Sequence, residues 1–323
     1  ASIGTIGVRY GKRKIELNNT TLDPIYLSSI LKNLKKKKIE NIILEASSHG
    51  LDQNRLDGLL FDVGIFTNLS HDHLDYHKNM KAYFKSKLYL FEKLLKKNST
   101  IITDIEISEY KQIRRVALKR KLNIQTISNH KSDLSIVSQK YFKEKQLIEI
   151  KYKNRNYKFQ TNLIGKIQIK NILMAILAAE KSGLNFKKII DVIDKIKPVS
   201  GRLEKIGNIK NKSKVILDYA HTPDALKVSL QNVKEQFKDK KISIVFGCGG
   251  NRDQSKRPVM GKIANYYCHK IYLTDDNPRN ENANLIRKTL KKYCQKAKDI
   301  SNRRLAIETA ISEMDQKDIL IIA

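Results

Sequence analysis

The sequence predicts an α/β protein with two domains, each built on a mostly parallel sheet. Short apolar runs alternate with amphipathic helical patterns along the chain, which is typical of strand–helix–strand units. Residues 198–202 interrupt this alternation with a proline and a glycine. The length of 323 residues suffices for two domains of ordinary size. We therefore expect one domain over residues 1–200 and another over residues 201–323.

The first domain is expected to open with a strand at residues 3–8 and a helix beginning at Pro24. Asp23 is a candidate N-cap for that helix, and proline suits the first helical position. An apolar stripe predicts a long helix from about residue 79 to residue 97. Further strands are expected at residues 42–44, 63–66, 100–103, 123–127, 133–138, 146–152 and 156–161, the last two as a hairpin. Further helices are expected between residues 103 and 123 and at residues 168–182 and 186–196.

The second domain repeats the alternation of strands and helices. Thr222 and Pro223 provide an N-cap and a first helical residue. Strands are expected at residues 214–219, 242–247, 270–274 and 318–322, and helices at residues 223–236, 258–267, 283–297 and 303–314. This order predicts a second parallel sheet.

Composition narrows the class of protein. The chain has 63 basic and 33 acidic residues and a formal net charge of +30. Lysine is spread through almost every segment beside isoleucine and asparagine, so we attribute the charge to an A+T-rich coding sequence rather than to a nucleic-acid-binding surface. There is no apolar run of membrane-spanning length and no signal-peptide pattern. Three scattered cysteines suit a reducing cytoplasm, where we expect a monomer with small-molecule partners and neither nucleic acid nor membrane.

The candidate active site lies where two apolar runs end. We expect residues 42–44 and 63–66 to be neighbouring buried parallel strands, and polar residues follow each of them. Open α/β sheets bind ligands at the carboxyl ends of their strands. Glu45 follows the first run and His73 follows the second, so both could face one magnesium ion that is shared with phosphate groups. A local cap or ion pair is the alternative for either residue alone.

Two other patterns in this region leave alternatives open. His71, His73 and Asp75 resemble a zinc-hydrolase ligand pattern, but Tyr76 stands where a further histidine ligand is needed. Lys87 falls on the apolar stripe of the helix over residues 79–97. Periodicity alone favours a lysine that extends its amine to water. The alternative is a buried amine that is used chemically.

Two loops of the second domain could bind ligands. Residues 247–253 (GCGGNRD) follow a strand and could hold an anion on backbone N–H groups, although tight turns often have this composition. Asp276, Asn277 and Arg279 follow another strand. An arginine beside a carboxylate and an amide suits a zwitterionic ligand, and simple helix capping is the alternative.

Six motifs in order resemble those of the Mur ligase family, in particular its diaminopimelate-adding members. They are EASSHGLDQNR, FTNLSHDHLDYH, PVSGRLE, LDYAHTPDAL, FGCGGNRDQSKRPVMG and TDDNPR. The resemblance implies a P-loop-type ATPase domain followed by a Rossmann-like domain. It implies an ATP-dependent ligase that forms an amide through an acyl phosphate. The expected substrates are a UDP-MurNAc-dipeptide and meso-diaminopimelate, and the expected cofactors are ATP, Mg²⁺ and CO₂.

The resemblance also implies roles for individual residues. Glu45 and His73 would hold magnesium, and Lys87 would react with CO₂ to give a carbamate that binds a second magnesium. Arg202 would stabilise phosphate charge in the transition state. The ATP contacts would be Asn68, Asn171, Arg202 and Asp218. The UDP-sugar-peptide contacts would be Thr20, Thr21, Ser47, Gln53 and Arg55. The diaminopimelate contacts would be Arg252, Asp276, Asn277 and Arg279.

Several family features are not found in the sequence. A GTNGKT-like P-loop and a uridine-binding domain are missing, and we expect both upstream of Ala1. A GKGHE-like segment is expected beyond Ala323. Ile167 and Gln168 replace a usual Phe-Asn pair, and Thr103 stands near a usual asparagine. We therefore expect the chain to be a fragment that is inactive by itself.

Overall fold

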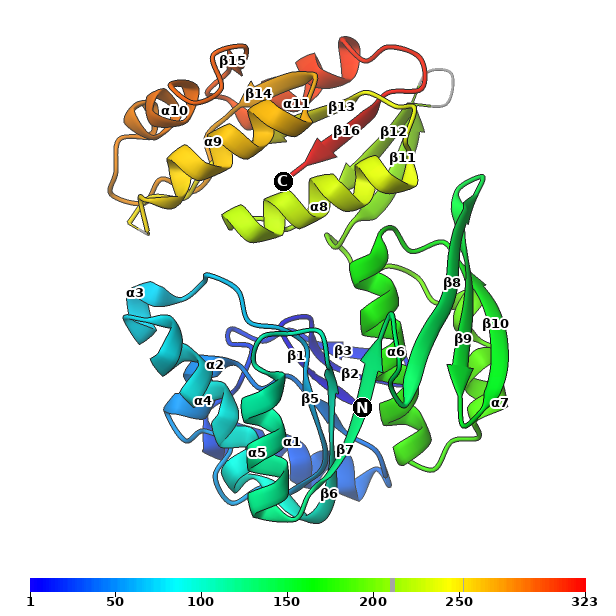
Figure 1. Ribbon diagram of the computed structural model, residues 1–323. Coiled ribbons are helices and arrows are strands. Elements are labelled where there is room, and N and C mark those ends of the chain that lie inside the picture. Colours follow the sequence, from blue (N-terminus) through cyan, green and yellow to red (C-terminus); the bar gives the residue numbers. More distant parts are fainter. Residues whose placement is uncertain (210–212, 252) are drawn as a thin grey trace.

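The computed structural model describes residues 1–209, 213–251 and 253–323 and has two lobes, one above the other in Figure 1. The first lobe comprises the elements from β1 to η1, and the second comprises those from β11 to β16. The first lobe contains a four-stranded sheet in the order β3-β2-β1-β4. Its strands are β1 (Ser2–Gly4), β2 (Gly7–Tyr10), β3 (Arg13–Ile15) and β4 (Ile43–Leu44), and α1 (Pro24–Lys36) lies between β3 and β4 in the chain.

A six-stranded sheet in the order β10-β9-β8-β7-β6-β5 forms the rest of the first lobe. Strands β5 to β8 are parallel, and β8, β9 and β10 are antiparallel. The strands are β5 (Phe61–Phe66), β6 (Leu95–Asp104), β7 (Asn123–Ser128), β8 (Leu134–Phe142), β9 (Lys145–Tyr152) and β10 (Arg155–Thr161). The helices are α2 (Ser48–Asp52), α3 (Leu74–His77), α4 (Met80–Lys93), α5 (Tyr110–Arg120), α6 (Lys166–Lys181), α7 (Phe186–Ile190) and η1 (Ile193–Lys195).

The second lobe has one six-stranded sheet in the order β11-β12-β16-β13-β14-β15, with only β11 antiparallel to its neighbour. The strands are β11 (Glu204–Ile209), β12 (Ser213–Leu217), β13 (Ile242–Phe246), β14 (Lys270–Leu273), β15 (Lys298–Asp299) and β16 (Ile319–Ile322). The helices are α8 (Pro223–Gln236), α9 (Lys256–Tyr267), α10 (Ala283–Lys291) and α11 (Arg303–Ser312). The expected parallel sheet is confirmed, and the edge strands β11 and β15 were missed.

The N-caps explain why several helices begin where the sequence predicts. Asp23 accepts the Tyr26 N–H before α1, Asn79 caps α4, and Thr222 accepts the Ala225 N–H before α8. The expected end of the long helix at residue 97 is wrong, because α4 ends at Lys93 and β6 begins at Leu95. The expected strand at residues 3–8 is also wrong, since the chain turns between β1 and β2 and pairs them antiparallel.

The two apolar runs that define the candidate site are not neighbouring strands of one sheet. In the described part of the chain, β4 pairs with β1, and β5 is an edge strand of the six-stranded sheet. Ile43 in β4 is 74% exposed, so the prediction of a buried strand is wrong there. The side chains that follow the two runs must therefore be brought together by helices rather than by a strand ladder.

One side of the lobe junction is held by polar contacts, and those of Gln236 among them are buried or partly buried. The tip of the β8–β9 hairpin provides Glu144, whose carboxylate pairs with Lys205 and Lys214 at 2.5 and 2.6 Å. Gln236 of α8 donates to the Glu144 carbonyl at 3.2 Å and accepts the Gly165 N–H at 3.0 Å. These contacts tie the start of α6 and the hairpin to the second lobe.

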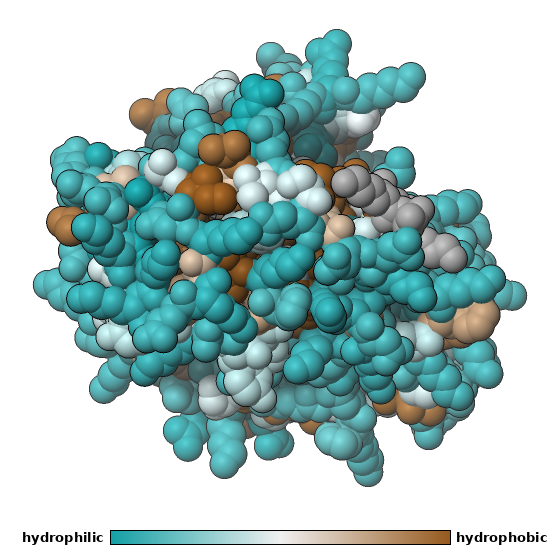
Figure 2. All heavy atoms as spheres, turned by 90° about the horizontal axis from the view of Figure 1, so that it is seen from above, coloured by the Kyte–Doolittle hydropathy of each residue, from teal (hydrophilic) through white to brown (hydrophobic). Residues whose placement is uncertain are grey.

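The face of the molecule on the side of the second lobe is largely polar (Figure 2). Figure 2 shows the molecule from the side of the second lobe, with hydrophilic side chains over most of this face and only small apolar patches. All three cysteines are free and buried. Within the described residues, no helix is both long enough and apolar enough to cross a bilayer.

Candidate active site

An aromatic cluster brings α2, α3 and α4 together around His73. The His73 ring centroid lies 4.9 Å from that of His49 and 5.8 Å from that of Tyr83. His77 stacks on Tyr83 at 5.1 Å, and its Nε2 lies 3.0 Å from the Ser48 hydroxyl. Burial lowers the pKa of His77 and also that of His49. The cluster is therefore a set of imidazoles packed on aromatic rings, at the edge of the first lobe that faces the second, where α3 lies in Figure 1.

His73 has a left-handed backbone, with φ of 55°, immediately before α3. The Asp72 carboxylate accepts the His73 N–H at 2.8 Å and lies 3.6 Å from Nε2 of that ring. It also lies 3.6 Å from Nε2 of His221 in the second lobe. Burial by itself would raise the pKa of Asp72, but its contacts with His221 and His73 outweigh burial and hold that pKa at about 2. Asp72 is thus an ionised carboxylate between the two lobes.

Lys87 of α4 reaches into the same cluster. Its Nζ lies 4.8 Å from the centre of the Tyr83 ring and 5.7 Å from that of Phe66. It donates to the Asn68 carbonyl at 3.3 Å. Burial lowers the pKa of Lys87, although nearby carboxylates act in the opposite direction. The amine therefore lies against aromatic rings. Periodicity alone favoured the other outcome, in which the amine extends into water.

Glu45 follows β4 and turns toward β1. Its Oε2 accepts the Thr5 N–H at 2.8 Å, and its carbonyl accepts the Thr21 hydroxyl at 2.9 Å. A Cβ on Gly4 would lie 2.8 Å from the Cβ of Glu45, so this close approach favours a glycine. The described part of the structure records no direct contact between Glu45 and His73.

Within the described residues, no group of three His, Cys, Asp or Glu side chains could hold a metal ion. The zinc-site alternative is therefore not supported. His71 lies against the second lobe instead, with its N–H 3.4 Å from Asp224 and its Nδ1 3.8 Å from Asp253. A magnesium ion bound to a nucleotide needs few protein ligands, because phosphates and waters supply the others. The donor types of Glu45 and His73 fit that kind of site.

The residues expected at the UDP-sugar-peptide site lie together beside Glu45. The Thr21 hydroxyl accepts the Ser47 N–H at 2.8 Å, and Arg55 donates to the Thr21 carbonyl at 2.8 Å. Arg55 also donates to Gln53 at 2.5 Å. Thr20 exchanges a 2.9 Å hydrogen bond with the hydroxyl of Thr5. The segment before α1 and the two ends of α2 thus converge on one polar surface.

The residues expected to contact ATP fall into two groups. The Arg202 guanidinium lies 4.8 Å from the centre of the Tyr219 ring, and Asp218 accepts the Leu203 N–H at 3.1 Å. Burial raises the pKa of Asp218, and its hydrogen bonds and the Arg202 charge oppose that rise. The other two candidates, Asn68 after β5 and Asn171 on α6, are exposed in the first lobe.

The expected diaminopimelate residues lie where two loops of the second lobe meet. Gly250 donates to the Asn277 carbonyl at 3.1 Å, and Arg279 donates to the Gly250 carbonyl at 2.7 Å. A Cβ on Gly250 would lie 1.9 Å from the Pro278 carbonyl oxygen, so a side chain cannot be accommodated there. Arg252, the fourth residue expected here, lies outside the described residues.

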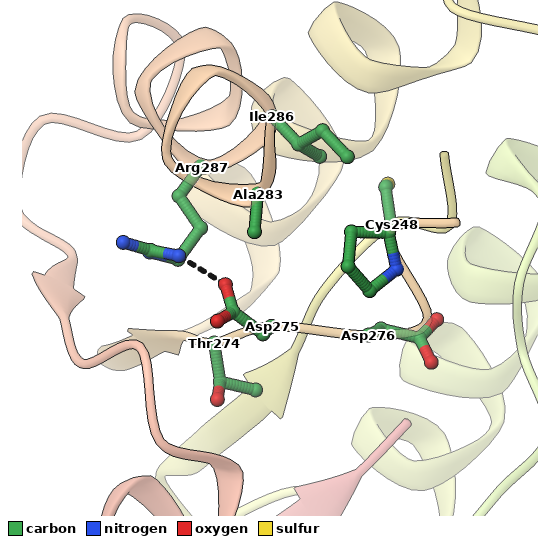
Figure 3. A pocket seen from close by; sticks show the side chains of 8 residues that line it. Cys248, Thr274, Asp275, Asp276, Ala283, Ile286 and Arg287 are labelled. Atoms are coloured by element: carbon green, nitrogen blue, oxygen red, sulfur yellow. Dashed lines mark hydrogen bonds and ion pairs between the residues drawn. The ribbon is translucent and has the colours of Figure 1, made fainter. Parts of the chain in front are cut away.

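A small pocket opens beside these loops. Figure 3 shows Asp275 pointing to Arg287, with which it pairs, while Asp276 points away from Arg287. Arg287 also donates to Asp299 at 2.5 Å. Asp275 is therefore engaged in holding α10, and Asp276 is the carboxylate of this loop that remains exposed.

Two features of the site were missed by the sequence analysis. His221 and Asp72 meet across the lobes, yet 149 residues separate them and neither has a helical or strand periodicity that relates it to the other. Arg257 and Glu281 form a 2.9 Å ion pair below the loop over residues 247–251, and Glu281 accepts the Asn251 N–H at 2.5 Å. In the sequence, the only sign of this ion pair under the loop is a charged residue, Arg257, on the buried face of a helix.

Family models match most of the chain. The model described as "Mur ligase middle domain" matches residues 1–179, and "Mur ligase, glutamate ligase domain" matches residues 201–323. The chain belongs to the Mur ligase family. This Mur ligase resembles the UDP-N-acetylmuramoyl-L-alanyl-D-glutamate–2,6-diaminopimelate ligase of Rickettsia montanensis, at 40% identity over 100% of this chain and 68% of the relative. The ligase of the same name from Zymomonas mobilis is 36% identical over 100% of this chain and 66% of its own.

Solved structures agree with this family. A UDP-N-acetylmuramoyl-L-alanyl-D-glutamate–2,6-diaminopimelate ligase aligns with a TM-score of 0.68 at 30% identity, covering 100% of this chain and 66% of that one. Mycobacterium tuberculosis folylpolyglutamate synthase complexed with ADP aligns with a TM-score of 0.74 at 15% identity, over 90% of this chain and 66% of that one, which shows the shared fold alone. The expected α/β fold class is confirmed. This chain spans about two thirds of the length of the diaminopimelate ligases that it matches.

Proposed function

We propose that this chain is the catalytic part of an ATP-dependent amide ligase that adds meso-diaminopimelate to UDP-MurNAc-L-Ala-D-Glu in peptidoglycan precursor synthesis. The observation that carries the proposal is the identity of about 40% to relatives named for this reaction, over the full chain. Several of the expected site residues that the structure describes support it, because they form polar groups, one beside Glu45 and others in the second lobe. The free thiols of all three cysteines support a cytoplasmic location.

In this proposal ATP activates the side-chain carboxylate of D-glutamate as an acyl phosphate, which the amine of diaminopimelate attacks with loss of phosphate. Glu45 and His73 would hold the magnesium that accompanies ATP, which would supply positive charge to the phosphate oxygens. Arg202 would add charge from the second lobe, where its guanidinium already lies over Tyr219 beside Asp218.

The environment of Lys87 supports its proposed carbamate. An amine attacks CO₂ only in its neutral form, and burial of Lys87 favours that form. The reaction joins the amine nitrogen to the carbon of CO₂ and releases one proton. The product replaces a cation among aromatic rings with two oxygen donors, which magnesium prefers.

The second lobe would select the amino acid. Arg279 would pair with a carboxylate of diaminopimelate, and exposed Asp276 would pair with an ammonium group. We infer the domain boundary near residue 200, since the sheets of the two lobes lie on either side of it.

The test is amino-acid-dependent turnover by the protein that carries this chain. ADP release should require both UDP-MurNAc-L-Ala-D-Glu and meso-diaminopimelate, and L-lysine should replace the latter poorly. Equal turnover with lysine would contradict the proposed substrate. ADP release that needs no amino acid would contradict the proposed ligase.

A further inference from the structure

The second side of the lobe junction is formed by a short loop of the first lobe. Residues 71 and 72 of this loop contact three segments of the second lobe. The His71 N–H lies 3.4 Å from Asp224, in the first turn of α8, and the His71 ring lies 3.8 Å from Asp253. Asp72 lies 3.6 Å from His221, in the loop before α8. These contacts are longer than those of Glu144 on the opposite side, so this side is the looser one.

The His221 ring is oriented for an ionic contact with Asp72. Its Nδ1 lies 3.1 Å from the Tyr219 carbonyl oxygen, which can only accept, so Nδ1 carries a proton. Nε2 faces Asp72, and it pairs with a carboxylate best when it is protonated too. The contact with Asp72 raises the pKa of His221, in agreement with an imidazolium. Lys256 donates to the His221 carbonyl at 3.0 Å, and its positive charge acts in the opposite direction on the pKa of His221.

Asp72 connects this contact to the first-lobe site. One carboxylate oxygen accepts the His73 N–H, while the other lies 3.6 Å from the rings of both His73 and His221. His73 has a left-handed backbone, which costs a non-glycine residue about 1 kcal/mol and needs such support. An approach or withdrawal of the second lobe therefore acts on the carboxylate that holds His73 in place.

We propose that Asp72 and His221 form a cross-lobe pair that couples the closure of the two lobes to the position of His73. Asp72 is a positioning residue, because it acts through His73 and through His221. The pair holds the second lobe, with its amino-acid loops, against the first lobe while His73 is in its binding orientation. The link between this coupling and turnover rests on the proposed ligase function; the coupling of the lobes does not.

Lobe closure can be measured without any ligase activity. His71→Cys and Asp253→Cys place one thiol on each lobe, and a short bis-maleimide reagent joins them only when the lobes are close. The three native cysteines are buried and leave the reporter thiols as the reactive ones. The Asp72→Asn and His221→Asn changes are then made in this background, singly and together. Asp62→Asn is the matched control, since Asp62 pairs with Lys96 inside the first lobe.

We expect each single change to lower the cross-linking rate several-fold, and the double change to lower it no further than the stronger single one, as coupled residues do. Rates equal to the Asp62→Asn control would overturn the proposal. A double-variant effect that equals the product of the single effects would also overturn it. Neither outcome depends on whether the protein is a ligase.

A second variant separates the two contacts of Asp72. Asp72→Glu keeps a carboxylate for His221 but moves it away from the N–H of the next residue. Cross-linking should stay near the parent rate, while kcat for ligation should fall on the order of tenfold to a hundredfold at an unchanged KM for the UDP-substrate. An unchanged kcat would refute the positioning of His73. Absence of ligation by the wild-type protein would instead count against the proposed function.

Discussion

At the scale of single residues, the environment of Lys87 favours a role in the reaction over a role in stabilising the helix. A lysine that only stabilises a helix is expected to pair with a carboxylate at the surface, but the Lys87 amine lies over Tyr83 and Phe66 and donates to a backbone carbonyl. The Lys87→Ala change should abolish turnover. Acetate or chloride should partly restore it, because a small anion can occupy the place of the carbamate.

Lys85→Ala provides the control for this prediction, since Lys85 lies exposed on the same helix two residues earlier. It should keep wild-type turnover. Full turnover by Lys87→Ala in the absence of added anion would rule out the carbamate.

His77 links protonation to stability. Its side chain is 6% exposed and burial lowers its pKa from 6.5, so the unfolded chain binds a proton more readily than the folded protein does. This contribution to stability is complete above pH 6.5 and is lost as the pH falls through the lowered pKa. We expect His77→Gln to have a melting temperature that falls less than that of the wild type between pH 7 and pH 5. Parallel melting curves for the two proteins over this range would show that His77 is not responsible.

At the scale of elements, glycines fix the approach of the two second-lobe loops. Gly250→Ala should lower the free energy of unfolding by about 1–3 kcal/mol, because the new methyl group meets the Pro278 carbonyl at a distance that forces the loops apart. Gly207→Ala is the control, since a Cβ at Gly207 in β11 would meet nothing within 4 Å. Urea unfolding measures the free energy of unfolding of both variants. Equal values for Gly250→Ala and Gly207→Ala would mean that the two loops can separate without cost.

Elements whose signals are local could be predicted from the sequence. The starts of α1, α4 and α8 follow from Asp23, Asn79 and Thr222, because an N-cap acts within three residues. The hairpin of β1 and β2 was missed, since its strands are three and four residues long and show no alternation. Strands β4 and β5 were assigned to one sheet, because their composition does not specify which strand pairs with which.

At the scale of the whole molecule, the polar residues that follow the two apolar runs come together for a different reason than the sequence analysis expected. His73 and His49 lie near each other through the packing of α2 and α3 on α4, and not through adjacent strands. The contact of Asp72 with His221 depends on how two lobes meet, and no local pattern encodes that arrangement. The motifs of the family supplied candidate site residues that periodicity alone could not.

The proposal that the second lobe binds the amino acid leads to a kinetic prediction. Arg279 belongs to the second lobe and contacts Gly250 there, so Arg279→Ala should raise the KM for diaminopimelate far more than the KM for ATP. Arg304→Ala, which removes an exposed arginine paired with Glu308 on α11, should change neither value. Equal increases of both KM values in Arg279→Ala would contradict its assignment to the amino-acid site.

The central claim, ligation through an acyl phosphate, can be tested most directly by isotope transfer in the protein that carries this chain. The side-chain carboxylate of D-glutamate in the UDP-substrate is labelled with ¹⁸O, and the released phosphate is analysed by mass spectrometry after ligation with meso-diaminopimelate. We predict that each phosphate carries one oxygen from the carboxylate, because that oxygen attacks phosphorus and leaves with it when the amine displaces phosphate. Amide product accompanied by unlabelled phosphate would contradict the account.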